Sequence, residues 1–359
     1  MMNDLSSVKR CLQEASVSIH REIQNHVTWT SKSVTATVSS SSHDAPQKVN
    51  TSGDQVLALD IIADLCVEDA LRGCEQIAGF ASEEREGFVS LNPKGKYIVV
   101  YDPLDGSQNI PVGISVGAIF GIFEGTCLED IVSGDDIVAA AYALFSAPLL
   151  FCYGDRKTSI CLEQYNFIND EWVTSIPNHM IPNKGKTYAI NEGNCANWDS
   201  LISTYVAQCL RGRSVRWTCC MVVDVHRHLL QGGCFLYPED KKYRNGRLRL
   251  VYEAYPMAFL WEKTGGLALA NVEGERILSK SFPRADVHVR CGVIMLGPDE
   301  SKKFNHLRSS LPTWNGGSVK AKTIKAKVEH DETVQSEVRY LKIALLIGAI
   351  IQIALFCRK

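Results

Sequence analysis

The 359-residue chain lacks several features that mark specialised classes of protein. Its 13 cysteines are an odd number and show no paired C-x-x-C spacing, so they give no disulfide or metal-ligand pattern. Residues 1–10 contain no apolar stretch that could act as a signal peptide. We therefore expect a cytosolic core with reduced thiols, and interpret most cysteines, including Cys219 and Cys220, as small buried hydrophobic residues.

The chain also lacks a dominant sign of charge. It carries 38 Lys and Arg against 40 Asp and Glu, so its bulk electrostatics predict no nucleic-acid partner and no strongly acidic one. The length is sufficient for a sizeable core and suggests about two domains.

One stretch, residues 101–110 (Y-D-P-L-D-G-S-Q-N-I), combines two carboxylates with a glycine turn. Asp102 and Asp105 follow the apolar run 97–100, which indicates a buried strand that opens into a turn. Carboxylate oxygens at a strand end suit hard cations such as Mg²⁺. Gly106 and Ser107 follow at once, and a glycine lets backbone N–H groups approach a phosphate. The stretch therefore predicts metal-assisted phosphoryl chemistry.

Further acids lie near the ends of other predicted elements. Asp54 and Asp60 stand near the start of a helix predicted over 53–71, and Glu83 and Glu84 end a short strand predicted at 79–82. Alone, adjacent carboxylates favour a solvated loop because they repel each other. The second acidic strand end at Asp102 shifts the interpretation towards a shared metal site.

The other elements are read from apolar periodicity. Residues 4–27 predict one or two amphipathic helices, and 28–52 a Ser/Thr-rich loop. A helix is expected at 221–230, where His226 and His228 lie two apart, do not share a helix face, and are interpreted as structural. Buried strands are expected at 112–123 and 137–153, and further strands at 187–190, 234–237, 246–253 and 288–296. By itself, the strand at 246–253, with two Arg and a terminal Glu, favours an exposed, salt-bridged face.

The C-terminal region differs in kind from the rest. Residues 313–339 are expected to form a charged linker. Residues 340–357 are apolar around the whole helix apart from Lys342 and Gln352, and they predict a short transmembrane tail anchor on an intracellular membrane. The alternative is a helix that docks on the enzyme.

Taken together, these segments resemble the fructose-1,6-bisphosphatase family, which includes the sedoheptulose-1,7-bisphosphatases. The resemblance runs from about Leu5 to Leu311 through G-D-Q-V, S-E-E, Y-D-P-L-D-G-S, N-E-G, D-V-H-R, F-L-Y-P and G-R-L-R-L-V-Y-E-A-Y-P-M-A. D-P-L-D-G-S alone is shared with inositol monophosphatases, whereas the block at 246–258 is specific to sugar bisphosphatases. The resemblance implies an α/β (α+β) fold, a layered α-β-α-β-α sandwich, with a catalytic domain at 1–190 and a substrate-binding domain at 191–312.

The resemblance also implies roles for particular residues. Two or three Mg²⁺ ions per subunit would be held by Asp54, Glu83, Asp102, the carbonyl of Leu104, Asp105 and Glu253. Asp60 and Glu84 would take the proton from the attacking water, and Asp105, Gly106, Ser107 and Gln108 would contact the departing phosphate. The sugar and distal phosphate would meet Asn191, Arg216, Trp217, Tyr237, Arg247 and Arg249. Arg216 would reach a neighbouring subunit's site, which implies a homodimer or homotetramer.

The chain departs from the family's pattern mainly around the substrate. Gln108 replaces a Ser, Asn194 and Trp217 each replace a Tyr, and Arg247 replaces a Lys, which keeps the charge and adds a planar fork. The expected activity is removal of the 1-phosphate from fructose-1,6-bisphosphate or sedoheptulose-1,7-bisphosphate. The alternatives are an inositol-phosphate phosphatase and an inactive membrane-tethered scaffold. Because Glu124 stands where a nucleotide-contacting Arg is usual, AMP inhibition is expected to be weak or absent.

Overall fold

The computed structural model describes residues 4–28, 37–38 and 58–310, which belong to one compact unit. Its six helices within these ranges are α1 (Asp4–His26), α2 (Ala58–Arg72), α3 (Ser200–Cys209), α4 (Met221–Gln231), α5 (Tyr255–Lys263) and α6 (Pro298–Ser310). Short 3₁₀ turns include η1 (Ser107–Val112) and η4 (Glu192–Asn197), and η5 (Leu250–Ala254) is a π-helical turn. The predicted tail at 340–357 and the linker before it lie outside the described residues.

The larger sheet has eight strands in the order β10-β9-β8-β7-β6-β5-β3-β4. Only β3 and β5 run parallel; the other neighbours are antiparallel. The strands are β3 (Ile77–Ser82), β4 (Val89–Ser90), β5 (Tyr97–Asp105), β6 (Val116–Glu124), β7 (Ile137–Phe145), β8 (Leu149–Asp155), β9 (Cys161–Asn166) and β10 (Glu171–Ile176).

The smaller sheet has five strands in the order β12-β11-β13-β17-β15. Its parallel centre, β11 beside β12 and β13, continues into the antiparallel pairs of β17 with β13 and β15. The strands are β11 (Thr187–Ile190), β12 (Ser214–Val215), β13 (Cys234–Tyr237), β15 (Leu267–Leu269) and β17 (Val293–Leu296). Two further strand pairs are β1 (Val27–Thr28) with β2 (Thr37–Val38), and β14 (Leu248–Arg249) with β16 (Arg290–Cys291).

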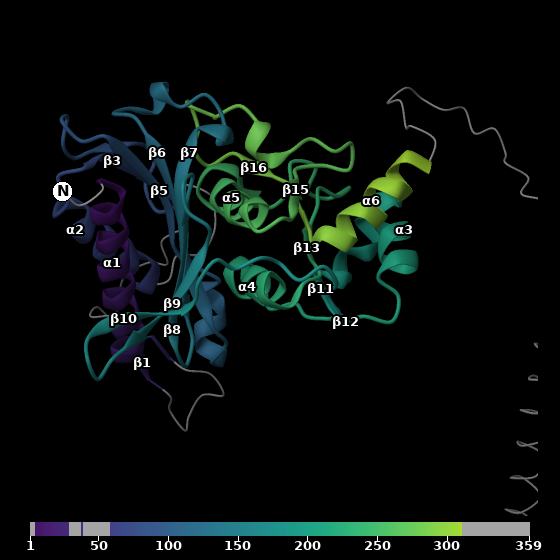
Figure 1. The fold of residues 1–359 in the computed structure, drawn as a ribbon, viewed down its shortest axis with the longest axis horizontal. Helices are drawn as coiled ribbons and strands as arrows, with labels where there is room; N and C mark the ends of the chain where they lie inside the picture. Colours follow the sequence, from purple (N-terminus) through teal and green to yellow (C-terminus); the bar gives the residue numbers. More distant parts are fainter. Residues whose placement is uncertain (1–3, 29–36, 39–57, 311–359) are drawn as a thin grey trace, which may run out of the picture. The chain divides into compact units, whose positions relative to one another are not determined.

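The helices and sheets alternate in five layers (Figure 1). α1 and α2 cover one face of the larger sheet, α4 and α5 lie between the two sheets, and α3 and α6 cover the far face of the smaller sheet. The predicted α-β-α-β-α sandwich is therefore confirmed for the described residues.

The pleat of the central strands explains why the larger sheet is apolar on both faces. Along β5, Ile98 and Val100 enter the core beneath α4 and α5, whereas Val99 and Tyr101 enter the core beneath α1 and α2. A strand buried on both faces reads as a continuous apolar run, as in β7, where all nine residues are buried.

The structure differs from the predicted elements in six places. The strand expected at 137–153 is a hairpin of β7 and β8, because Ser146 and Pro148 make the turn between them. The strand expected at 288–296 is broken at Gly292 into β16 and β17. The segment 161–176 and the helices α3 and α6 were not predicted. In α6 the apolar residues are too sparse for a clear period, whereas α3 buries Leu201, Ile202 and Tyr205 at helical spacing, a signal that the prediction left out. The strand expected at 246–253 is wrong and is treated with the site.

The core histidines follow the predictions, but the cysteines do so only in part: of the 12 described, six are buried, four are partly buried, and Cys195 and Cys219 are exposed. His226 contacts the hydroxyl of Tyr142 at 2.8 Å and His228 contacts the carbonyl of Asp224 at 2.6 Å, and burial lowers the pKa of both histidines to about 4. All described cysteines are free thiols. Cys220 is buried as expected, but Cys219 is exposed because it lies at a bend that lines a pocket.

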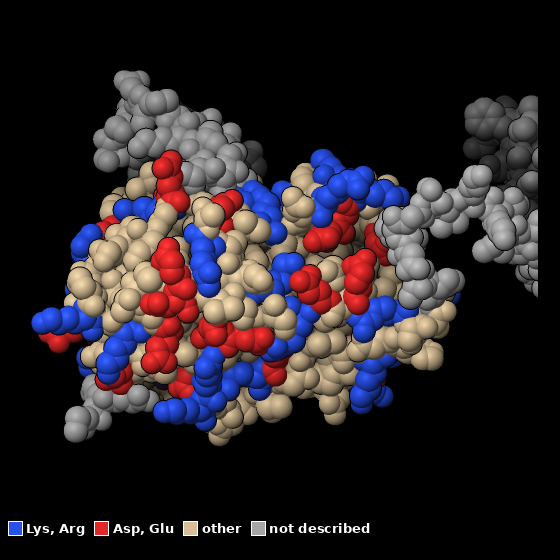
Figure 2. All heavy atoms as spheres, turned by 90° about the horizontal axis from the view of Figure 1, so that it is seen from above, with Lys and Arg blue, Asp and Glu red and all other residues tan. Residues whose placement is uncertain are grey.

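On the face seen in Figure 2, acidic and basic side chains are interspersed, with no broad field of one sign.

Candidate active site

The end of β5 holds the two carboxylates of the 101–110 stretch in fixed positions. Asp102 Oδ1 accepts a hydrogen bond from the backbone N–H of Leu104 at 2.9 Å. Asp105 Oδ2 accepts one from the N–H of Val222, at the start of α4, at 2.7 Å. Both side chains are buried. The strand and helix backbones therefore set where these oxygens point.

The turn after Asp105 requires a glycine. Gly106 has φ 78°, and a Cβ at this position would lie 2.6 Å from the Cβ of Cys220. A side chain is excluded by both the left-handed backbone and the close neighbour. The turn therefore lets the backbone of Gly106 and Ser107 border the same cavity as the acids.

Glu253 reaches the acids of β5 because the chain does not continue as a strand. β14 ends at Arg249, and the π-helical turn η5 carries Glu253 back so that its carboxylate accepts the N–H of Arg249. π-helical turns are rare in proteins, but those that occur often lie at functional sites. Carboxylate oxygens of Asp102, Asp105 and Glu253 all lie within 4.8 Å of one another.

Burial and mutual repulsion make this cluster unstable as a set of bare anions. Burial raises the pKa of Asp102 well above its ordinary value, and neighbouring carboxylates, first Glu83, raise it further. The pKa of Glu253 is raised well above its ordinary value for the same reasons. Burial also raises the pKa of Asp105, although the N–H of Val222 partly offsets it. Hard oxygen donors held together in this way fit a divalent cation.

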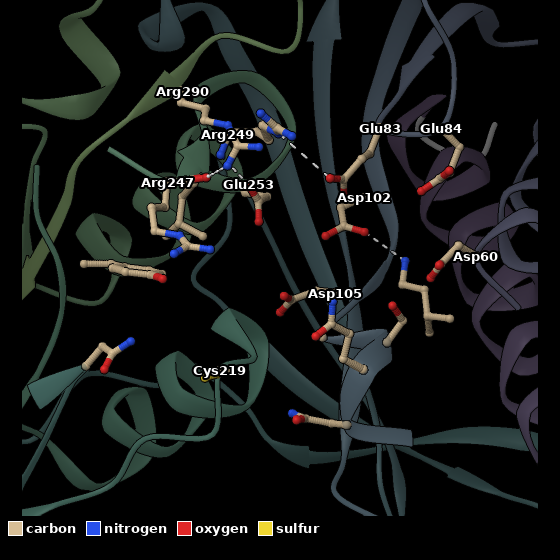
Figure 3. Close-up of a pocket in the computed structure, with 18 of the residues that line it drawn as sticks. Asp60, Glu83, Glu84, Asp102, Asp105, Cys219, Arg247, Arg249, Glu253 and Arg290 are labelled. Atoms are coloured by element: carbon tan, nitrogen blue, oxygen red, sulfur yellow. Dashed lines mark hydrogen bonds and ion pairs between the residues drawn. The ribbon is translucent and has the colours of Figure 1, made fainter. Parts of the chain in front are cut away.

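Three more acids border the cavity from the neighbouring elements α2 and β3. Asp60 lies in the first turn of α2 and is buried, while Glu83 and Glu84 follow β3. The N–H of Glu83 donates to the carbonyl of Tyr101 at 3.1 Å, so the parallel pairing of β3 with β5 places Glu83 near Asp102. Figure 3 shows Asp60 and Glu84 on one side of this acid end, towards α2.

The opposite end of the cavity, of about 520 Å³, is lined by cationic, amide and aromatic groups. The guanidinium of Arg247 lies over the rings of Tyr243 at 4.4 Å and Tyr237 at 5.9 Å. Arg249 stands between the two ends, its Nε 3.9 Å from Glu83 Oε1. Asn191, the N-cap of η4, completes this end. Figure 3 shows the carboxylates and the guanidinium groups of Arg247, Arg249 and Arg290 around one space.

Trp217 forms an aromatic wall of this end. Its ring is stacked near Phe235, with centroids 6.0 Å apart, and meets Tyr237 edge-on at 5.0 Å. The indole N–H donates to Cys219 Sγ at 2.9 Å.

The structure brings together most of the predicted site residues. Two are exceptions. Arg216 is exposed, donates to the carbonyl of Val215 and does not line the cavity. Asp54 lies outside the described residues. The predicted residues that line the cavity are Asp60, Glu83, Glu84, Asp102, Leu104, Asp105, Gly106, Ser107, Gln108, Asn191, Trp217, Tyr237, Arg247, Arg249 and Glu253.

Four lining residues were missed from the sequence, Asn109, Cys219, Leu248 and Arg290. Arg290 stands directly across from Arg249 in the β14–β16 pair, a long-range pairing that no local motif reveals. Cys219 is two residues from Trp217, so its place beside a predicted contact was a usable signal.

Models of the fructose-1-6-bisphosphatase N-terminal and C-terminal domains match residues 2–160 and 181–306. The cytosolic fructose-1,6-bisphosphatase of Spinacia oleracea is 41% identical over 237 residues, 62% of this chain and 69% of the relative. That of Brassica napus is 40% identical over 274 residues, 72% of this chain and 79% of the relative. The crystal structure of Leishmania major fructose-1,6-bisphosphatase in holo form superposes with a TM-score of 0.74 at 26% identity, covering 86% of this chain and 95% of that one.

The layered fold and the acid-lined cavity, with these matches, define a phosphatase of the phosphoric monoester hydrolase class. Within that class, the chain belongs to the fructose-1,6-bisphosphatase family.

The predicted localisation, tail-anchored to an intracellular membrane, is contradicted by these relatives, whose names place them in the cytosol. Among the described residues, no helix is both long and apolar enough to cross a bilayer. α1 has the length, at 23 residues, but carries Lys9, Arg10, Glu14 and Arg21 among its apolar positions.

Proposed function

We propose that the chain is a Mg²⁺-dependent ketose bisphosphatase that hydrolyses the 1-phosphate of fructose-1,6-bisphosphate or sedoheptulose-1,7-bisphosphate. The observation that carries this proposal is the division of one cavity into a carboxylate end and a guanidinium end. A monophosphate substrate needs only the first, and the second provides charge for another phosphate.

The carboxylate end fits the metal. Asp102, Asp105 and Glu253 present oxygens within 4.8 Å of one another, and Glu83 and the Leu104 carbonyl border the same space. We infer that these groups hold Mg²⁺, with Asp54 as a further candidate from the sequence. Bound Mg²⁺ would stabilise negative charge on the phosphoryl and leaving oxygens.

The protein groups have separate tasks in the proposed reaction. Asp60 and Glu84, on the α2 side of the acid end, accept the proton of the attacking water. Gly106 and Ser107 turn their backbone amides towards the transferred phosphate. The phosphate can come close because Gly106 has no side chain. Gln108 borders the same phosphate at the exposed rim.

The far end holds the rest of the substrate. Arg247 offers a planar fork to the distal phosphate, and its stacking on Tyr243 keeps that fork in place. Asn191 and Tyr237 add polar contacts, while Trp217 forms the wall beside the sugar. Arg249 lies between the two ends and neutralises part of the acid cluster through Glu83.

Arg216 belongs to the proposal in a different way. Because it is exposed and outside its own cavity, we infer that it contributes to the site of a second copy in a homodimer or homotetramer. Sedimentation of the full chain tests this state; a monomer at assay concentration would contradict it.

The activity is tested by phosphate release from the full chain with Mg²⁺ on three substrates: fructose-1,6-bisphosphate, sedoheptulose-1,7-bisphosphate and inositol 1-phosphate. We expect release from at least one ketose bisphosphate, and none after EDTA. No release from any substrate would contradict the enzyme, and preference for the inositol ester would contradict the guanidinium end as a phosphate site.

A further inference from the structure

The bend at residues 217–222 connects the two ends of the cavity. At one end, Trp217 belongs to the aromatic wall. At the other, Val222 donates its N–H to Asp105, and the buried Cys220 thiol lies 3.1 Å from the same carboxylate oxygen. Cys219 stands between them and is the exposed thiol that lines the cavity.

The backbone at Cys219 is held in an unfavourable conformation. Its φ is 63°, in the left-handed region that non-glycine residues seldom adopt. Contacts fix both neighbours. The buried Cys220 thiol lies 3.1 Å from Asp105 Oδ2. Thr218 donates its N–H to Asp224 at 2.9 Å and accepts at its carbonyl from Asn109 at 2.9 Å. A strained backbone persists where surrounding contacts fix it, and such positions cluster at ligand-binding sites.

Cys219, in this conformation, contacts the indole of Trp217 through its sulfur. The indole N–H donates to the thiol sulfur at 2.9 Å, so the sulfur limits rotation of the ring about its side-chain bonds. Phe235 and Tyr237 restrain the ring by contact alone, and such contacts permit sliding. The hydrogen bond is directional and selects one orientation.

We propose that Cys219 is a positioning residue for substrate recognition, which acts by fixing the Trp217 indole in the wall that faces the sugar. This inference rests on the proposed function and deepens it. The wall meets Tyr237, over whose ring Arg247 lies, so its position sets the space between the acid end and the distal phosphate. Ketose bisphosphates of six and seven carbons differ in that spacing.

The test compares Cys219→Ala, Cys219→Ser and Trp217→Phe with the unmodified chain on both ketose bisphosphates. Loss of one neutral hydrogen bond corresponds to roughly a three- to tenfold change in binding. We expect Cys219→Ala to raise KM by that factor for the preferred substrate, to change the KM ratio between the substrates, and to leave kcat within about twofold. Cys219→Ser keeps an acceptor and should restore most of the ratio.

A double variant separates positioning from a general structural effect. If the sulfur acts through the indole, Cys219→Ala should add nothing in a Trp217→Phe background, because the N–H is already gone. Cys195→Ala is the matched control, since Cys195 is exposed but does not line the cavity. An unchanged KM ratio in Cys219→Ala, or additive effects in the double variant, would overturn the proposal.

A readout without substrate keeps this test distinct from the test of the enzyme. Near-ultraviolet circular dichroism should change on Cys219→Ala in the unmodified background and not in the Trp217→Phe background. Identical spectra in the first comparison would overturn the contact itself. Absence of phosphate release from the unmodified chain would contradict only the proposed function.

Discussion

The two ends of the cavity are built in different ways. At the acid end, Asp102, Asp105 and Glu253 are 3%, 7% and 7% exposed, and backbone N–H groups from β5, α4 and β14 hold their oxygens. At the far end, Trp217, Tyr237 and Arg247 are only partly buried. Stacked and edge-on ring contacts, a cation over a ring and a thiol hold these three side chains.

This difference separates chemistry from selectivity. Backbone hydrogen bonds fix the carboxylates at the acid end. Such fixing matters because a small displacement of a metal ligand changes the reaction rate. Side-chain contacts at the far end tolerate substitution, so the preferred substrate can change while the acid end stays the same. Variants at the acid end should therefore affect kcat, and variants at the far end KM.

The largest expected effect is the loss of a carboxylate from the acid end. Asp105→Asn keeps the volume and an acceptor for the N–H of Val222, but removes the negative charge that a cation needs. We expect kcat to fall by at least about 100-fold with KM changed much less. Phosphate release under saturating substrate measures it.

Asp69→Asn, on the exposed side of α2, is the control for the change of residue type. Thermal unfolding should show that both variants fold. If Asp105→Asn retained a tenth of the activity, the acid end would no longer be the site of chemistry.

At the far end, Arg247→Ala should act mainly on KM. The variant removes a bidentate, charged partner for the distal phosphate, and we expect KM to rise roughly 10- to 100-fold with kcat within about threefold. Arg247→Lys keeps the charge but not the planar fork, so its KM should lie between those of the unmodified chain and Arg247→Ala. Initial rates over a wide substrate range give both constants. A fall in kcat alone would place Arg247 with the chemistry and remove the contrast between the ends.

The acid end could be predicted from the sequence because several of its residues are close together in the chain. Asp102, Asp105 and Gly106 lie within five residues at the end of the apolar strand β5, so strand periodicity and residue type were sufficient. Glu253 was found through the family resemblance, but the backbone structure predicted around it was wrong. A strand over 246–253 was expected, and a π turn places the carboxylate instead, because Glu253 folds back onto the N–H of Arg249.

The far end was harder to predict from the sequence because its contacts join residues far apart in the chain. Arg290 enters the cavity only through pairing with β14, and Cys219 was interpreted as buried because most cysteines are. A periodicity argument places a residue on an element and says little of which distant element it meets. The predicted boundary between domains at residues 190 and 191 stays a prediction for the same reason.

Removing metal should expose the strain of the acid end as a dependence of stability on pH. Burial raises the pKa of Asp102 in the folded state above that of the unfolded chain, so folding takes up protons. Without metal, the unfolding free energy should fall as pH rises from the unfolded pKa through the raised folded pKa. Each unit of pKa difference corresponds to about 1.4 kcal/mol.

Asp102→Asn isolates this effect, because the amide oxygen can still accept the N–H of Leu104. In EDTA, the variant should be more stable than the unmodified chain, and the difference should grow from pH 5 to pH 8. Subtraction cancels His226 and His228, whose pKa values, lowered to about 4, destabilise both proteins as pH falls. Mg²⁺ should stabilise the unmodified chain more than the variant. Denaturant unfolding that shows no pH-dependent difference would contradict a strained carboxylate cluster.

The smallest expected effect lies at the rim of the cavity, at Gln108. This side chain is exposed at the rim beside Ser107, so Gln108→Ser removes no buried contact and should leave stability within about 0.5 kcal/mol. It also restores the residue that the resemblance leads us to expect. If Gln108 tunes selectivity, the ratio of kcat/KM between the two ketose bisphosphates should change about two- to threefold while the larger kcat stays constant. A change in kcat for both substrates would instead give Gln108 a part in the chemical step, since a rim residue that only selects substrates cannot slow a step they share.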